Sequence, residues 1–178
     1  MDDLTEAGAA TGRRLCTALL AKIDEQIERT QHLIELLPAG GEEWRPAETG
    51  NWPVGVLLGH LLESLAGFCA VLTAVEPERL AHLADLRRDP VNHFCLCREA
   101  ADRIPAYQAG IADGFALLND VRLGTPVPTI FVPDGEPVLT LLLGNLEHLI
   151  NHKHQLFTYL KQMGVAVSTG DLYRLRGA

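Results

Sequence analysis

The sequence lacks the features that mark several large classes of protein. Its 178 residues contain no cluster of lysine and arginine, and the formal net charge of -8 makes the average surface repel phosphate. The start of the chain, residues 1–6, is acidic and leads into Gly, Thr and Arg rather than an apolar run, unlike a secretory signal peptide. We therefore expect a cytoplasmic protein that binds no nucleic acid.

Cysteine is scarce, and its spacing contains no C-x-x-C motif. In a reducing compartment the four cysteines are not expected to form disulfides. Cys16 and Cys69 stand in helical apolar patterns that are typical of small buried thiols. Cys95 and Cys97 could contact a metal, but a spacing of two is weak support for that. The sequence also has no H-E-x-x-H motif, which leaves a metalloprotease without support.

Hydrophobic residues make up 47% of the chain and charged residues 21%, as in an ordinary globular protein. This length suits one compact domain, which we expect to span residues 1–178, with a bundle over about 4–164 and a tail over 165–178. Apolar residues at helical steps predict the first helix. The predicted helices cover about 4–38, 53–75, 98–121 and 138–163.

The second predicted helix is apolar almost all round, so a membrane span has to be considered. His60, Glu63 and Ser64 interrupt the apolar run and argue against a span. A central helix of a bundle explains the same pattern, and it leaves His60 and Glu63 as polar groups that need partners. We therefore expect no membrane contact.

The connections have recognisable turn chemistry. Asn51 is a plausible cap at the start of the second helix, and Pro105 should end or kink the third. Residues 131–137 are predicted to form a turn-rich loop or a short hairpin. Gly164 closes the last helix, and Leu172 and Tyr173 in the tail are expected to pack back onto the bundle.

Four helices joined by loops predict an all-α four-helix bundle, an architecture in which facing helices commonly hold metals. His148 and His152 are four residues apart, so their rings leave one face of a helix one turn apart. His60, in the most apolar segment, would complete a set of three. Three neutral imidazoles on one divalent ion would leave positions open for water or substrate. The alternative is that each histidine is simply solvated or hydrogen-bonded.

Other polar residues extend this candidate site. Glu63, one turn after His60, could orient a ligand or serve as a catalytic base, and an ion pair is an equal alternative. Asn145, Gln155 and Tyr159 continue the polar face of the last helix and are candidates for binding substrate or orienting ligands. His154 points about 200° away from His152. The remaining histidines stand in polar or loop contexts and are expected at the surface: His32, His82 and His93.

The chain resembles the DinB/YfiT-like superfamily of metal-binding four-helix bundles. The resemblance rests on Trp44-Arg45-Pro46, on the segment from Asn51-Trp52-Pro53 to His60-Leu61, and on His148-x-x-x-His152-Lys153-His154-Gln155-Leu156-x-x-Tyr159-Leu160. Lys153-His154 stands where the family usually has Arg-Gly, and Pro53 where it usually has Ser. The resemblance implies an up-down-down-up bundle with long connections, frequent homodimers, and a divalent ion, often zinc or nickel, on His60, His148 and His152.

Some proteins of that superfamily are thiol S-transferases or related isomerases that use bacillithiol, mycothiol or glutathione. The first hypothesis is therefore a metal-dependent enzyme that acts on a small molecule, with a low-molecular-weight thiol as cosubstrate; a related hydrolase or isomerase activity stays open. The second is a non-catalytic metal- or ligand-binding stress-response module, in which the ion only ties two helices together. A third is a metal-free bundle whose polar face binds an organic ligand.

Overall fold

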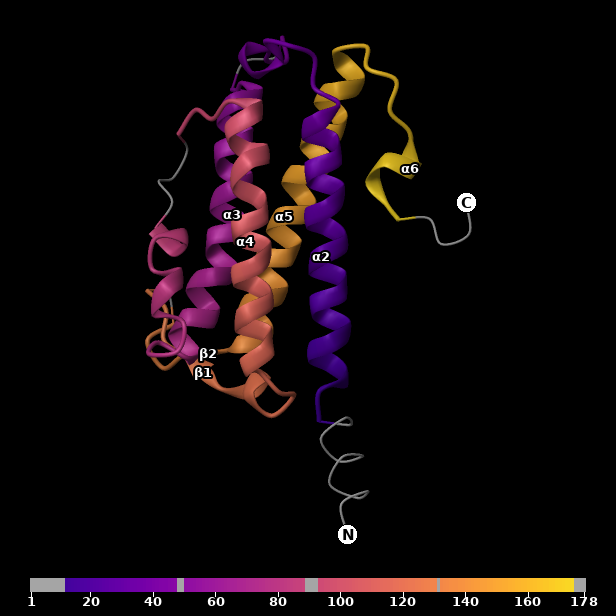
Figure 1. The fold of residues 1–178 in the computed structure, drawn as a ribbon. Helices are drawn as coiled ribbons and strands as arrows, with labels where there is room; N and C mark the ends of the chain where they lie inside the picture. Colours follow the sequence, from indigo (N-terminus) through magenta and orange to yellow (C-terminus); the bar gives the residue numbers. More distant parts are fainter. Residues whose placement is uncertain (1–11, 48–49, 89–92, 131, 175–178) are drawn as a thin grey trace.

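The computed structural model describes residues 12–47, 50–88, 93–130 and 132–174, and four long helices dominate them (Figure 1). In Figure 1, α2 and α5 run upward while α3 and α4 run downward, so the predicted up-down-down-up bundle is observed. The all-α fold class is confirmed. The helices are α2 (Arg14–Glu35), α3 (Val54–Val75), α4 (Cys97–Leu117) and α5 (Val138–Gln162).

Short elements fill the connections. The predicted hairpin is reduced to a two-residue ladder, in which β1 (Pro126–Val127) runs antiparallel to β2 (Glu136–Pro137), with Val127 opposite Glu136. One more short helix, α6 (Thr169–Leu172), lies in the tail beside α2 and α5. Single turns of 3-10 helix complete the connections: η1 (Gly41–Glu43), η2 (Ala81–Leu83), η3 (Leu86–Arg88) and η4 (Arg122–Gly124).

The apolar face predicted for the first helix packs into the core, with one exception. Leu19, Ile23, Ile27 and Ile34 are buried, at the steps of four and seven that place them on one face of the helix. Leu15 is 46% exposed, because it lies at the start of α2, where the helix reaches the edge of the bundle. The predicted start of this helix, near residue 4, lies outside the described residues.

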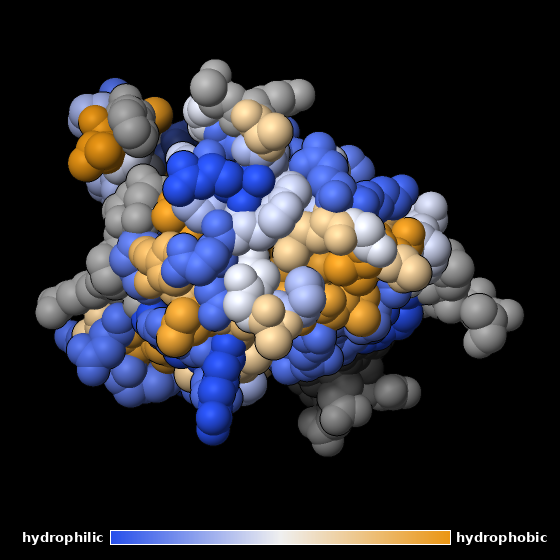
Figure 2. Space-filling view, turned by 90° about the horizontal axis from the view of Figure 1, so that it is seen from above, coloured by the Kyte–Doolittle hydropathy of each residue, from blue (hydrophilic) through white to orange (hydrophobic). Residues whose placement is uncertain are grey.

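Helix α3 is the central helix of the bundle and packs against both α4 and α5. By length and composition it could cross a membrane, yet 67% of its most apolar stretch is buried inside the protein. That burial is consistent with the core helix of a soluble protein. Viewed from the end where α3 and α4 begin, the surface carries hydrophobic patches between hydrophilic side chains (Figure 2).

Two boundary predictions were wrong, and α4 does not end at Pro105. Pro53 rather than Asn51 occupies the cap position of α3, where the N–H of Val54 donates to the carbonyl of Trp44 at 2.8 Å. Pro105 lies inside α4, on the exposed side of the helix, so of the two predicted effects only the end of the helix is ruled out. That helix ends at Leu117 rather than near residue 121.

The tail packs back onto the bundle through a buried lysine. Lys153 is only 1% exposed, and its Nζ donates to Gln26 Oε1 at 2.6 Å and to the carbonyl of Leu172 at 2.8 Å. Leu172 is itself buried, as expected, whereas Tyr173 is 47% exposed and meets the bundle through its ring face, with the ring centroid 5.3 Å from Lys153 Nζ. Lys153 thus links α5, α2 and the tail, although sequence reasoning noted it only as a departure from a motif.

Candidate metal centre

Helices α3 and α5 bring three imidazoles together. His60 of α3 faces His148 and His152 of α5, and the three ring centroids lie 4.4 to 4.7 Å apart. The Nε2 atoms of His60 and His148 are 2.8 Å apart. One nitrogen of each ring lies within 4.8 Å of one nitrogen of each of the others, so the three could ligate a single metal ion. All three side chains are half-buried.

Hydrogen bonds at Nδ1 orient two of the three rings. His60 Nδ1 is 2.7 Å from Glu63 Oε2, and His152 Nδ1 is 3.0 Å from Gln155 Oε1. A carboxylate and an amide oxygen only accept hydrogen bonds, so each ring places its proton on Nδ1 and its lone pair on Nε2. Metal-ligating histidines are commonly held in this way. Glu63 thus occupies the position of a ligand-orienting residue, one of the roles considered from sequence.

Aromatic side chains surround the imidazoles. Trp52 lies edge-on to His60 at 4.9 Å between ring centroids and is stacked on His152 at 6.0 Å. Gln155 Nε2 donates to Tyr159 Oη at 2.8 Å, and the Tyr159 ring meets Trp44 edge-on at 5.4 Å. Gln155 and Tyr159 therefore form a chain behind His152. The contact of Trp52 with two of the histidines was not predicted, because nothing in the sequence shows how the loop before α3 folds.

Burial favours the form of histidine that binds metals. Removal from solvent lowers the pKa of both His148 and His152, and the neighbouring His60 adds to this effect. A neutral imidazole has a free lone pair, whereas a protonated one repels a cation. The three imidazole nitrogens, the orientation of two rings and the lowered pKa of His148 and His152 fit a divalent ion.

The other residues singled out in the sequence lie elsewhere. Asn145 donates from Nδ2 to the carbonyl of Leu141 at 3.1 Å and lies so close to α3 that a Cβ on Gly67 would collide with its Oδ1. These contacts give Asn145 a part in helix packing. His154 is exposed and stacks on Phe157, away from the other three histidines, as predicted.

The three histidines expected at the surface are each near a carboxylate. His32 Nε2 lies 2.8 Å from Asp171 Oδ1, and the exposed His82 pairs with Asp113 at 3.2 Å. His93 is only partly exposed, and its Nε2 is 3.9 Å from Glu99 Oε1. His32 is also only partly exposed, so of the three only His82 has a plainly exposed position.

A shallow hollow of about 310 Å³ gives access to the histidines from outside. Gly144, Glu147 and Asn151 of α5 line it together with His148 and His152. Gly144 has open space where a side chain would be, so no side chain at this position narrows the hollow. A small molecule could therefore reach the edge of the imidazole cluster.

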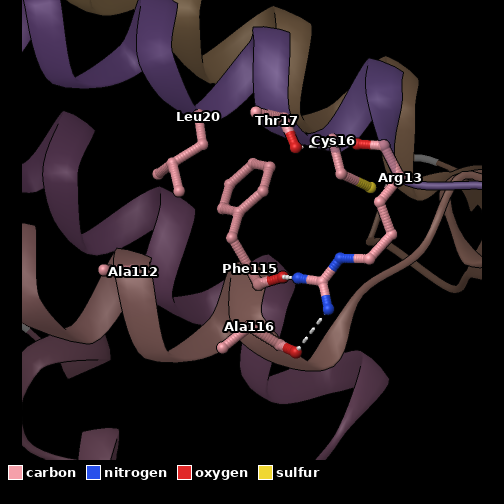
Figure 3. Close-up of a pocket in the computed structure, with 7 residues that line it drawn as sticks. All are labelled: Arg13, Cys16, Thr17, Leu20, Ala112, Phe115 and Ala116. Atoms are coloured by element: carbon pink, nitrogen blue, oxygen red, sulfur yellow. Dashed lines mark hydrogen bonds between the residues drawn. The ribbon is translucent and has the colours of Figure 1, made fainter. Parts of the chain in front are cut away.

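Another hollow, of about 240 Å³, lies between α2 and α4 (Figure 3). Arg13 reaches across it to the carbonyl of Phe115 at 3.1 Å, and the thiol of Cys16 lies beside it. Burial and the neighbouring Asp120 raise the pKa of Cys16 to about 11, so almost none of it is thiolate at neutral pH. This hollow offers no activated group and is not the better candidate site.

Comparison with known proteins places the chain in a family. The sequence model of the DinB superfamily matches residues 22–156, and the chain belongs to that superfamily. Among solved structures, it is similar to a crystal structure of a DinB-like protein, YjoA, from Bacillus subtilis, with a TM-score of 0.63 and 19% identity. That match covers 84% of this chain and 94% of YjoA. No curated protein matches the sequence.

Proposed function

We propose that this protein binds one divalent metal ion through His60, His148 and His152 and acts as a metal-dependent thiol S-transferase on a small molecule. The observation that carries the proposal is the convergence of three imidazoles, two of them oriented through Nδ1, beside an open hollow that His148 and His152 line. Imidazole donors suit zinc and nickel equally well. A closed structural site would need a fourth protein ligand and no access from solvent.

A divalent ion at this position supplies Lewis acidity, which lowers the pKa of a thiol bound to it. The net reaction joins the thiol sulfur to an electrophilic carbon of the second substrate, whose leaving group departs with the bonding electrons while the thiol proton goes to solvent. Glu63 and Gln155 fix the directions of two imidazoles throughout. Trp52 covers His60 and His152 and limits the approach of water from that side.

The ligand set is tested first by elemental analysis of untagged protein purified without chelator. His152→Ala should carry about one divalent ion per chain less than wild type, because two imidazoles hold an ion far more weakly than three. His154→Ala is the matched control, since this neighbouring ring points away from the cluster. Equal metal content in both variants would remove the proposed ligand set.

The activity is tested by turnover with bacillithiol, mycothiol or glutathione and a common electrophile. Metal-dependent conversion with one of them, lost in His152→Ala, supports the transferase. If the ion binds but no thiol reacts, the alternative of a non-catalytic metal- or ligand-binding stress-response module replaces it. Light scattering in the same preparation tests the homodimer expected of this superfamily, and a cytoplasmic location stays part of the proposal.

A further inference from the structure

A second group of metal-binding side chains lies at the start of α4. Donor atoms of His93, Cys95 and Glu99 all lie within 4.8 Å of one another, and His93 Nε2 is 3.9 Å from Glu99 Oε1. Cys95 is completely buried, the His93 side chain is 24% exposed, and that of Glu99 43%. The three donors thus lead from the core to the surface.

The backbone holds these donors in place. Burial alternates along this segment: Cys95 is completely buried, whereas Phe94 and Leu96 are partly exposed, and the Phe94 ring also lies against Gly55 of α3. The N–H of Cys95 donates to the carbonyl of Gly55 at 2.9 Å. Because α4 begins at Cys97, Glu99 in its first turn comes back over this segment.

Helix α3 has glycine where residues 93–96 come closest to its backbone. A Cβ on Gly59 would collide with the carbonyl oxygen of His93, so the close approach requires glycine at this position. Gly59 directly precedes His60 in α3. The two clusters therefore lie on adjacent faces of one helix, and they share no donor atom.

We propose that His93, Cys95 and Glu99 form a second metal site, which takes zinc or a similar thiophilic divalent cation. A thiolate, a neutral imidazole and a carboxylate together carry a charge of about -2, which balances a divalent ion. The thiolate selects against magnesium and calcium, which prefer oxygen ligands. Zinc requires donor distances of about 2.0 to 2.3 Å, and the exposed Glu99 carboxylate can turn toward an ion held by the other two donors. An ion here links α4 to α3 beside His60.

The test uses the untagged full chain with His148→Ala and His152→Ala, so that its outcome does not depend on the proposed function. Cobalt is the probe, because a thiolate ligand gives it a charge-transfer band in the near ultraviolet that histidine sites lack. About one equivalent should bind with this band. Adding Cys95→Ser should abolish the band, whereas the matched control Cys97→Ser, whose thiol donates to Glu42 at 3.2 Å, should keep it.

Glu99→Gln keeps the proposal testable if Cys95→Ser fails to fold, because Glu99 lies at the surface. In the same chain with His148→Ala and His152→Ala, Glu99→Gln should weaken zinc binding at least about tenfold in a chelator competition. The control His82→Gln, at an exposed histidine outside the cluster, should not. The absence of a thiolate band in the starting chain would overturn the proposal. So would a band that survives Cys95→Ser, or equal zinc affinity in Glu99→Gln and His82→Gln.

Discussion

Glu63 Oε2 lies 2.7 Å from His60 Nδ1, one turn further along α3, and this contact fixes which nitrogen of His60 faces the other two histidines. The neutral substitution Glu63→Gln keeps an acceptor but removes the charge that makes His60 a stronger ligand. We expect metal affinity to fall about 10- to 100-fold. Chelator competition measures it, with Glu147→Gln on the rim of the hollow as control. Unchanged affinity would mean that the carboxylate has no part in the site.

Substitutions along the hydrogen-bonded chain from His152 through Gln155 to Tyr159 should weaken metal binding less with distance from His152. Gln155→Met removes the acceptor for His152 Nδ1 and frees the ring to change tautomer, whereas Tyr159→Phe removes only the hydroxyl that accepts from Gln155. We therefore expect Gln155→Met to weaken metal binding about tenfold and Tyr159→Phe by less. Titration with zinc gives both constants. A larger effect of Tyr159→Phe would indicate that Tyr159 contacts the ligand directly.

The sequence predicted the bundle well, because helical periodicity and turn residues are local properties. His148 and His152 were placed together for the same reason, since a spacing of four fixes their relation within one helix. That His60 faces them follows from how α3 and α5 pack, and was inferred from its apolar surroundings. Trp52 and His93 were not connected with metal-binding clusters, because loops without a period determine their positions. Only the fold brings them to α3.

Lys153 should give the protein a pH-dependent stability. Burial lowers its pKa from 10.5 to about 8 in the folded state, so between these values the unfolded chain binds more protons. The free energy of unfolding should therefore rise as pH increases from about 8 to 10.5, by on the order of 2 to 3 kcal/mol from this residue. Lys153→Met removes that contribution.

Urea unfolding of wild type and Lys153→Met across this range measures the difference between the two. The thiols of Cys16 and Cys97 act in the opposite direction, since their pKa values are raised in the folded state, but they contribute equally to both proteins. Parallel curves for the two proteins would show that Lys153 does not titrate in this range.

The thiols of Cys16 and Cys97 should not replace an added thiol substrate. Burial, together with Glu42, raises the pKa of Cys97 to about 12, and that of Cys16 is about 11. At neutral pH fewer than about one in a thousand of either would be thiolate, which is the reactive form. Native protein should therefore label slowly at these positions with an aromatic disulfide, and rapidly in denaturant. Fast native labelling of Cys97, mapped by mass spectrometry, would contradict this.

Gly59 should be far less tolerant of a side chain than Gly144, although both are helical. An added Cβ at Gly59 meets the carbonyl oxygen of His93, which cannot move freely because Cys95 is hydrogen-bonded to Gly55. Gly59→Ala should therefore lower the free energy of unfolding by about 1 to 3 kcal/mol. Gly144→Ala places its methyl in open space and should raise it by about 0.5 to 1 kcal/mol, because alanine favours the helix. Equal effects of the two substitutions in urea unfolding would mean that residues 93–96 are not held against α3.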